Sequence, residues 1–182
     1  SCFYHRYFSH KSFTTSRIVQ FMFGWIVCVC YQGGPVWWAS IHRKHHKKCG
    51  SIDDPHSPGN GYYYSFLGWP FFETKIHKKY VLDLLKYPEL VFLDRFSYTP
   101  SILTFFLLQH TINIKNTLYL YVYPCIFGNL INLHFNVFFH SSKEKNKCMA
   151  INTNISMKFL CIKLISFDSY KNFMLPALFG HI

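Results

Sequence analysis

Two groups of histidines constrain the fold of this chain more than any other feature. The second group has the spacing His-x-x-His-His and consists of His42, His45 and His46. Positions i, i+3 and i+4 share one face of a helix, and neutral imidazole is the commonest protein ligand for first-row transition metals. The spacing therefore predicts a helix whose histidine face forms a metal site, or half of a dinuclear one.

The first group lies upstream, where His5 and His10 enclose the segment Arg6–Ser9. Residues five apart are separated by about 140° around an ideal α-helix, so they do not face one metal from a single side of a regular helix. Two arrangements fit: a distorted helix end, or ligation from two sides of one ion. All five histidines are predicted metal ligands.

The composition indicates a chain that buries most of its surface, partly in lipid. Half of the residues are hydrophobic and 20% are aromatic, whereas 15% are charged, against about 25% in ordinary globular proteins. The formal net charge is +11, but the cationic residues are scattered among apolar blocks. This pattern favours a membrane surface and a phosphate-bearing substrate, and it argues against nucleic acid as a partner. The seven cysteines form no C-x-x-C pair, and Cys28 and Cys30, which lie inside an apolar run, are interpreted as small buried hydrophobes.

The composition of the chain changes from Pro100 onward. Before it, the apolar run 18–31 is shorter than the ~20 residues that a membrane span needs, and Gly33-Gly34-Pro35 predicts a bend after the run. An amphipathic helix is expected within 73–95, ending before Pro88. After it, residues 105–182 are predicted to be a divergent, low-complexity apolar tail, with 118–139 as the best transmembrane candidate because this stretch has no Lys, Arg, Asp or Glu. A buried core helix, or no helix at all, is the alternative for 118–139.

The order of the motifs resembles one family, the integral-membrane fatty-acyl desaturases, and above all its acyl-CoA delta-9 (stearoyl-CoA) branch. The resemblance covers residues 3–104 and rests on the following stretches: His5 to His10, Gln32 to Pro35, Trp37-Trp38, His42 to His46, Asp54 to Ser57, Gly61 to Trp69 and Val91 to Phe96. It implies an all-α, integral membrane helical protein with a cytosolic cap that carries the histidine boxes, located in the endoplasmic reticulum of a eukaryote. Residues 1–104 would then be a partial desaturase-like domain in a chain that is incomplete at both ends.

The resemblance also implies an activity. Family members are oxidoreductases that use two irons, O2 and electrons from cytochrome b5 or a ferredoxin-type donor to insert a cis double bond into a saturated acyl-CoA within the membrane. An unactivated C–H bond is too strong for acid–base chemistry of side chains, so the cofactor must supply the oxidising power. The predicted iron ligands are His5, His10, His42, His45 and His46, and no further catalytic side chain is predicted.

Other residues receive weaker assignments from the resemblance. Trp37 and Trp38 line the acyl tunnel or anchor the chain at the membrane interface. Arg43 meets the acyl-CoA phosphates or points outward. Asp53 and Asp54 either accept a hydrogen bond from a histidine ring or lie in a solvated loop, and the loop is favoured.

One part of the family pattern is absent from the sequence, since no second His-x-x-His-His follows His46. Five of the eight or nine expected ligands are present. Two interpretations follow: an active desaturase of which this chain is an internal fragment, or a truncated, inactive remnant that binds at most one metal ion. A basic membrane-associated protein whose histidines bind no metal is the third.

Overall fold

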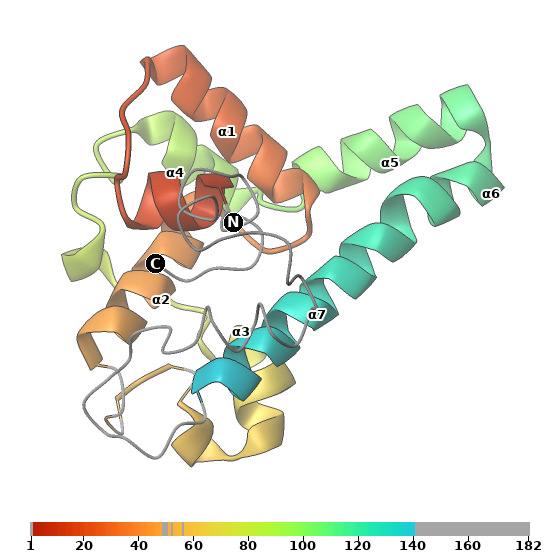
Figure 1. Cartoon of the computed structure of the whole chain (residues 1–182). Coiled ribbons are helices and arrows are strands. Elements are labelled where there is room, and N and C mark those ends of the chain that lie inside the picture. Colours follow the sequence, from red (N-terminus) through yellow and green to blue (C-terminus); the bar gives the residue numbers. More distant parts are fainter. Residues whose placement is uncertain (1, 49–50, 52, 56, 141–182) are drawn as a thin grey trace, which may run out of the picture.

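Every regular element of the described chain is a helix. The computed structural model describes residues 2–48, 51, 53–55 and 57–140. Within this part there are no strands, so the all-α prediction is confirmed for it. The N-terminal half gathers four helices into one cluster, as Figure 1 shows, and these are η1 (Cys2–Ser9), α1 (Arg17–Val29), α2 (Pro35–Lys48) and α4 (Pro88–Arg95).

The chain turns sharply between α1 and α2, as the Gly-Gly-Pro segment predicts. Gly33 adopts φ +81°, a value that glycine tolerates and other residues rarely take. Gly34 lies so close to α4 that a Cβ atom there would stand 1.7 Å from Asp94 Oδ1. Both oxygens of Asp94 accept a hydrogen bond from the backbone N–H of Trp37, at 3.1 and 3.2 Å. A carboxylate from α4 therefore caps the N-terminus of the helix that carries the second histidine group.

Apolar and aromatic side chains fill the space between these four helices. Phe8, Val36 and Leu90 are each 0% exposed. The hydroxyl of Tyr4 donates to the carbonyl of Val27 at 3.1 Å, so that η1 is joined to α1 by a buried polar contact as well. This core holds η1 against α2, the two helices that carry the histidine groups.

The middle of the chain is made of short turns. Its elements are η2 (Pro58–Asn60), η3 (Tyr64–Gly68), α3 (Trp69–Phe72) and η4 (Lys78–Tyr80). The predicted amphipathic helix within 73–95 is wrong, because the chain forms turns up to Lys86 and Pro88 begins α4 instead of following a helix. Proline at the first helical position lacks only an N–H that would have no partner in the helix, which explains the start.

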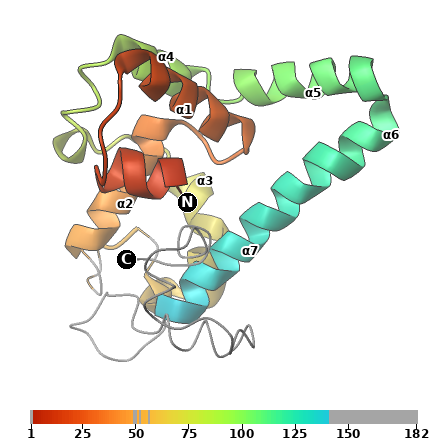
Figure 2. The same ribbon diagram turned by 45° about the horizontal axis from the view of Figure 1, so that its top comes forward.

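The remaining helices form a long hairpin that projects from the cluster (Figures 1 and 2). They are α5 (Thr99–Ile112), α6 (Ile114–Thr117), η5 (Leu118–Val122) and α7 (Tyr123–His140). The chain is helical over 118–139, and the transmembrane assignment of this stretch stays a prediction. None of the helices in the described residues has both the length and the apolar character needed to cross a bilayer. The boundary at residue 104 stays a prediction, and the part of the tail at 141–182 lies outside the described residues.

Candidate metal centre

Four of the five predicted ligands converge. One nitrogen from each of His5, His10, His42 and His46 lies within 4.8 Å of the others. His42 is at the centre of the group, since its Nε2 atom is 3.2 Å from Nε2 of His10 and 2.9 Å from Nε2 of His46. His5 and His42 are buried, whereas His10 and His46 are exposed. The group thus has one side toward the core and one side toward the surface.

The first histidine pair converges because η1 is a π-helix. The backbone N–H of His10 donates to the carbonyl of His5 at 3.0 Å, which is the i to i+5 bond of that helix type. The wider turn places residues five apart one above the other, and the two imidazole centroids are 4.4 Å apart. Of the two arrangements that the spacing allows, the structure therefore adopts the distorted helix.

The fifth predicted ligand, His45, lies outside this group of four. On a helix His46 is displaced by about 40° from His42, whereas His45 is displaced by about 60° in the opposite direction. Its Nδ1 atom is 2.7 Å from Oδ1 of Asp54, and both side chains are almost fully buried. The expectation of a solvated loop is wrong for Asp54 and correct for Asp53, whose side chain is 61% exposed and pairs with Lys48. Metal ligation by His45 stays a prediction.

The two tryptophans hold the second histidine helix in place. The ring of Trp38 stacks on His42, with centroids 4.8 Å apart and an interplanar angle of 19°. Trp37 stacks on Trp69 and donates its indole N–H to the carbonyl of Glu73 at 2.7 Å. Both residues thus have well-defined protein contacts, and their role in an acyl tunnel stays a prediction.

Arg43 is held by contacts within the protein. Its guanidinium carries five N–H groups, and these meet backbone carbonyls and a carboxylate of the protein itself. The side chain is 14% exposed. All five donors are used within the protein, so the alternative that Arg43 points outward is wrong, and a role of Arg43 in substrate binding stays a prediction.

The surroundings of His10 favour its neutral imidazole. Desolvation by its neighbours, followed by the positive charge of Arg43, lowers the pKa of His10. A metal ion binds the neutral ring, so this shift favours ligation.

At the other end of α2, burial raises the pKa of Asp94 to about 7 even though backbone N–H groups of Trp37 and Val36 oppose the rise.

The geometry of the four nitrogens fits one transition-metal ion. Metal–imidazole bonds measure about 2.1 Å, so two opposite ligands of one ion stand about 4 Å apart. The four nitrogens occupy a similar span. All-imidazole sites suit iron, zinc, copper and nickel. In the part of the chain that the structure describes, this is the one group of three or more potential ligands with such spacing.

Sequence comparisons agree with the site. The model of the fatty acid desaturase family matches residues 1–160, and the chain therefore belongs to that family, whose members use iron. Its relatives include a probable chloroplastic lipid desaturase of Arabidopsis thaliana, 37% identical over 97 residues, which are 50% of this chain and 27% of that protein. The sn-2 palmitoyl-lipid 9-desaturase of Nostoc sp. is 37% identical over 100 residues, 51% of this chain and 35% of that protein.

A third relative differs in substrate. The acyl-CoA 5-desaturase of Anemone leveillei is 37% identical over 102 residues, 50% of this chain and 30% of that protein. The matched region thus spans about a third of these relatives or less, and their names differ in both bond position and acyl carrier. No solved structure matches the chain.

Proposed function

We propose that the chain acts in unsaturated fatty acid biosynthesis, as the part of a desaturase that holds the first two histidine boxes. The reaction is the O2-dependent insertion of a cis double bond at position nine of a saturated acyl-CoA at a di-iron centre. The observation that carries this proposal is the convergence of His5, His10, His42 and His46 within 4.8 Å. It occurs within the region that matches the desaturase family.

The residues of this chain have defined tasks in such a reaction. Iron, when bound, would supply the oxidising power needed to break unactivated C–H bonds. His5 and His42 approach the site from the buried side, while His10 and His46 approach from the surface. Trp38 covers one face of the His42 ring and keeps that imidazole in a fixed orientation. The buried pair of His45 and Asp54 fixes the orientation of the neighbouring ring in the same way.

The finer parts of the proposal concern substrate, partners and location. Position nine and the acyl-CoA carrier are supported by the resemblance of the motifs at 3–104 to the stearoyl-CoA branch. Cytochrome b5 or a ferredoxin-type protein is the proposed electron donor. A membrane location, the endoplasmic reticulum in a eukaryote, is supported by the large exposed hydrophobic residues of the hairpin, including Phe106, Leu107 and Leu120.

One observation favours a second candidate function. The four nitrogens span little more than the coordination shell of a single ion, and no second His-x-x-His-His follows His46. A chain with this site alone would bind one metal ion and would not turn over substrate. This is the inactive remnant.

The two candidates differ in product and in metal content. The full chain is expressed in cells whose own desaturase has been deleted, and the double-bond position of their fatty acids is determined by mass spectrometry. Metal content is measured on the purified chain, with His42→Ala as the control that removes the central ligand. A delta-9 product with two irons supports the desaturase. One ion without product supports the remnant, and no difference between the chain and His42→Ala refutes both.

A further inference from the structure

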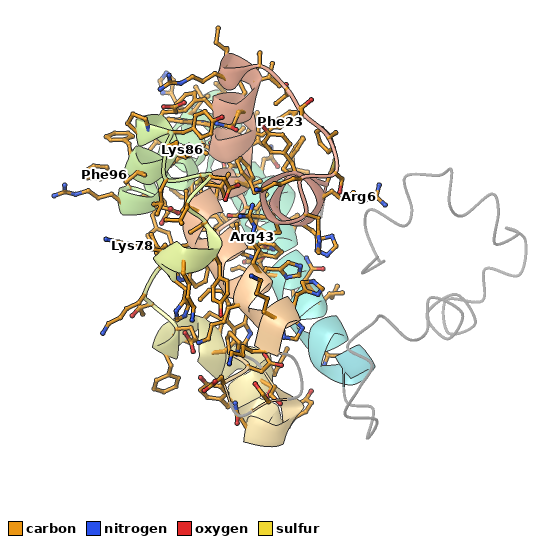
Figure 3. All side chains as sticks on the ribbon, turned by 90° about the vertical axis from the view of Figure 1, so that its left-hand side faces the viewer. Arg6, Phe23, Arg43, Lys78, Lys86 and Phe96 are labelled. Carbon is orange, nitrogen blue, oxygen red and sulfur yellow. The ribbon has the colours of Figure 1, made fainter. Side chains whose placement is uncertain are left out.

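Arg43 binds to two separate segments at once. Its Nε donates to the carbonyl of Ser9 at 2.9 Å, and one terminal nitrogen donates to the carbonyl of Phe8 at 2.5 Å. The other terminal nitrogen donates to the carbonyl of Tyr80 at 2.7 Å. Figure 3 shows Arg43 in the middle of the molecule, whereas Arg6 and Lys78 reach away from it. A side chain of α2 therefore holds the backbone of η1 within the segment between its two histidines.

Asp83 anchors this arrangement from outside both histidine groups. Its two oxygens accept from Arg43 at 2.7 and 3.2 Å, the forked geometry that arginine and carboxylates prefer. Oδ2 also lies 3.0 Å from the ammonium of Lys11. Burial alone would raise the pKa of Asp83, but the hydrogen bonds from Arg43 and Lys11 outweigh burial and lower it. The carboxylate thus stays charged between two cations.

The two cations occupy corresponding positions in the chain. Lys11 directly follows His10, and Arg43 directly follows His42. One carboxylate therefore binds the residue after a ligand in each histidine group. The nitrogens of those two ligands are 3.2 Å apart, although the two residues are separated by 32 positions in the sequence.

We infer that Asp83 and Arg43 are positioning residues that set the distance between the first and second histidine groups. Metal ligands must be held to within about 0.5 Å of their bonding geometry, and long side chains on separate helices do not achieve this alone. The clamp of Arg43, Asp83 and Lys11 supplies the rigidity, because the side chain of Arg43 beside His42 is bonded to the backbone of Phe8 and Ser9 and, through Asp83, to the side chain of Lys11 beside His10. The inference rests on the proposed metal-binding function of the four histidines.

The test is a titration of the purified full chain with Co²⁺, whose visible absorption reports the geometry of its ligands. Asp83→Asn keeps the size of the side chain but replaces one acceptor by an NH2 group that faces two cations. We expect Co²⁺ to bind at least about 10-fold more weakly, because the loss of groups that orient metal ligands costs 10–100-fold in affinity. The absorption bands of the bound ion should change as well, since the ligands no longer meet at the same distances.

Glu89→Gln is the matched control. It makes the same chemical change in another carboxylate that is paired with an arginine, because Glu89 binds Arg17 at 2.7 and 2.8 Å at the surface. Affinity and spectrum should stay those of the unsubstituted chain. Arg43→Lys is the second variant, since lysine keeps the charge but lacks the fork of five donors. It should weaken binding as Asp83→Asn does, and it decides the test if circular dichroism shows that Asp83→Asn is unfolded.

The outcomes distinguish a failure of the positioning role from a failure of the proposed metal binding. If the unsubstituted chain binds Co²⁺ and folded Asp83→Asn or Arg43→Lys binds it with the same affinity and spectrum, the positioning role is refuted while metal binding stands. If the unsubstituted chain binds no Co²⁺, or His42→Ala binds it equally well, both are refuted. Weaker binding in the clamp variants with no effect of Glu89→Gln supports the inference.

Discussion

The helix cluster (residues 2–48 and 81–95) and the helical hairpin (residues 99–140) contain the same kinds of apolar residue but differ in how far they bury them. Both are rich in aromatic and aliphatic side chains. In the cluster Phe8 and Leu93 are at most 1% exposed, whereas in the hairpin Phe106, Leu107 and Leu120 are 61% to 71% exposed. All four converging histidines belong to the cluster. A metal site needs fixed ligands, and the buried packing of the cluster fixes side chains.

The hairpin is attached to the cluster mainly at one point, the C-terminal end of α1. Ser101 Oγ donates to the carbonyl of Cys28 at 2.6 Å, and the hydroxyl of Tyr121 donates to the carbonyl of Val29 at 2.8 Å. Asn129 donates to the carbonyl of Cys30 at 2.9 Å. The last carbonyls of a helix have no partner within it, so the hairpin supplies the donors that complete α1.

The largest expected difference between the two regions concerns packing. Phe8→Ala should lower the free energy of unfolding by about 3–5 kcal/mol, because it opens a cavity around a side chain that is 0% exposed. Phe106→Ala, the same change in the hairpin at a side chain that is 61% exposed, should alter it by about 0.5 kcal/mol or less. Denaturant unfolding followed by circular dichroism measures both. Equal losses would mean that the hairpin packs as tightly as the cluster.

A smaller effect is expected at the buried pair beside the metal centre. Asp54→Ala removes the partner of His45 Nδ1, 2.7 Å away, and leaves a polar ring atom buried, which costs about 1–3 kcal/mol. The neighbouring residue is the control: Asp53→Ala breaks an exposed ion pair with Lys48 and should cost about 0.5 kcal/mol or less. The thermal unfolding midpoints of the two variants report the difference. A midpoint for Asp54→Ala that equals the one for Asp53→Ala would show that the carboxylate is replaceable by water.

The sequence was sufficient for the residue types and helical faces of the site but not for its contacts. The His-x-x-His-His spacing correctly predicts a helix, because the periodicity is local. His45 lies outside the group of four with its Nδ1 paired to Asp54, a contact that the spacing does not predict, and its metal ligation stays a prediction. The convergence of His5 and His10 depends on a π-helix, and no residue of that segment marks this helix type in advance.

The sequence does not predict which distant segments contact one another. Asp83 binds Arg43, which is forty positions away in the sequence. Asp94 caps the N-terminus of α2, although it lies in α4 and is distant from that helix in the sequence. The sequence leaves two roles open for Arg43, a contact with the acyl-CoA phosphates or an outward orientation, and neither includes a contact with Asp83. The burial of Arg43 under η1 and η4 follows from how the helices pack, which hydrophobic periodicity does not specify.

The smallest effect tests whether the hairpin takes part in the metal site at all. Tyr121→Phe removes the hydroxyl that bonds to the carbonyls of Val29 and Ser101, at a cost of about 1 kcal/mol. Amide hydrogen exchange should become faster in η5 and at the end of α1, because these elements lose their shared hydrogen bond. Affinity for Co²⁺ should not change, since no residue of this contact belongs to the four-histidine group.

Tyr119→Phe provides the comparison, because Tyr119 lies on the same element with its side chain 60% exposed. Its exchange pattern should match that of the unsubstituted chain. A loss of Co²⁺ affinity in Tyr121→Phe alone would show that the contact between the hairpin and α1 affects the positions of the histidines. The two regions would then form one functional unit, although they differ in how far they bury their apolar residues. With unchanged affinity, the helix cluster holds the metal centre by itself, and the hairpin completes α1 without shaping the site.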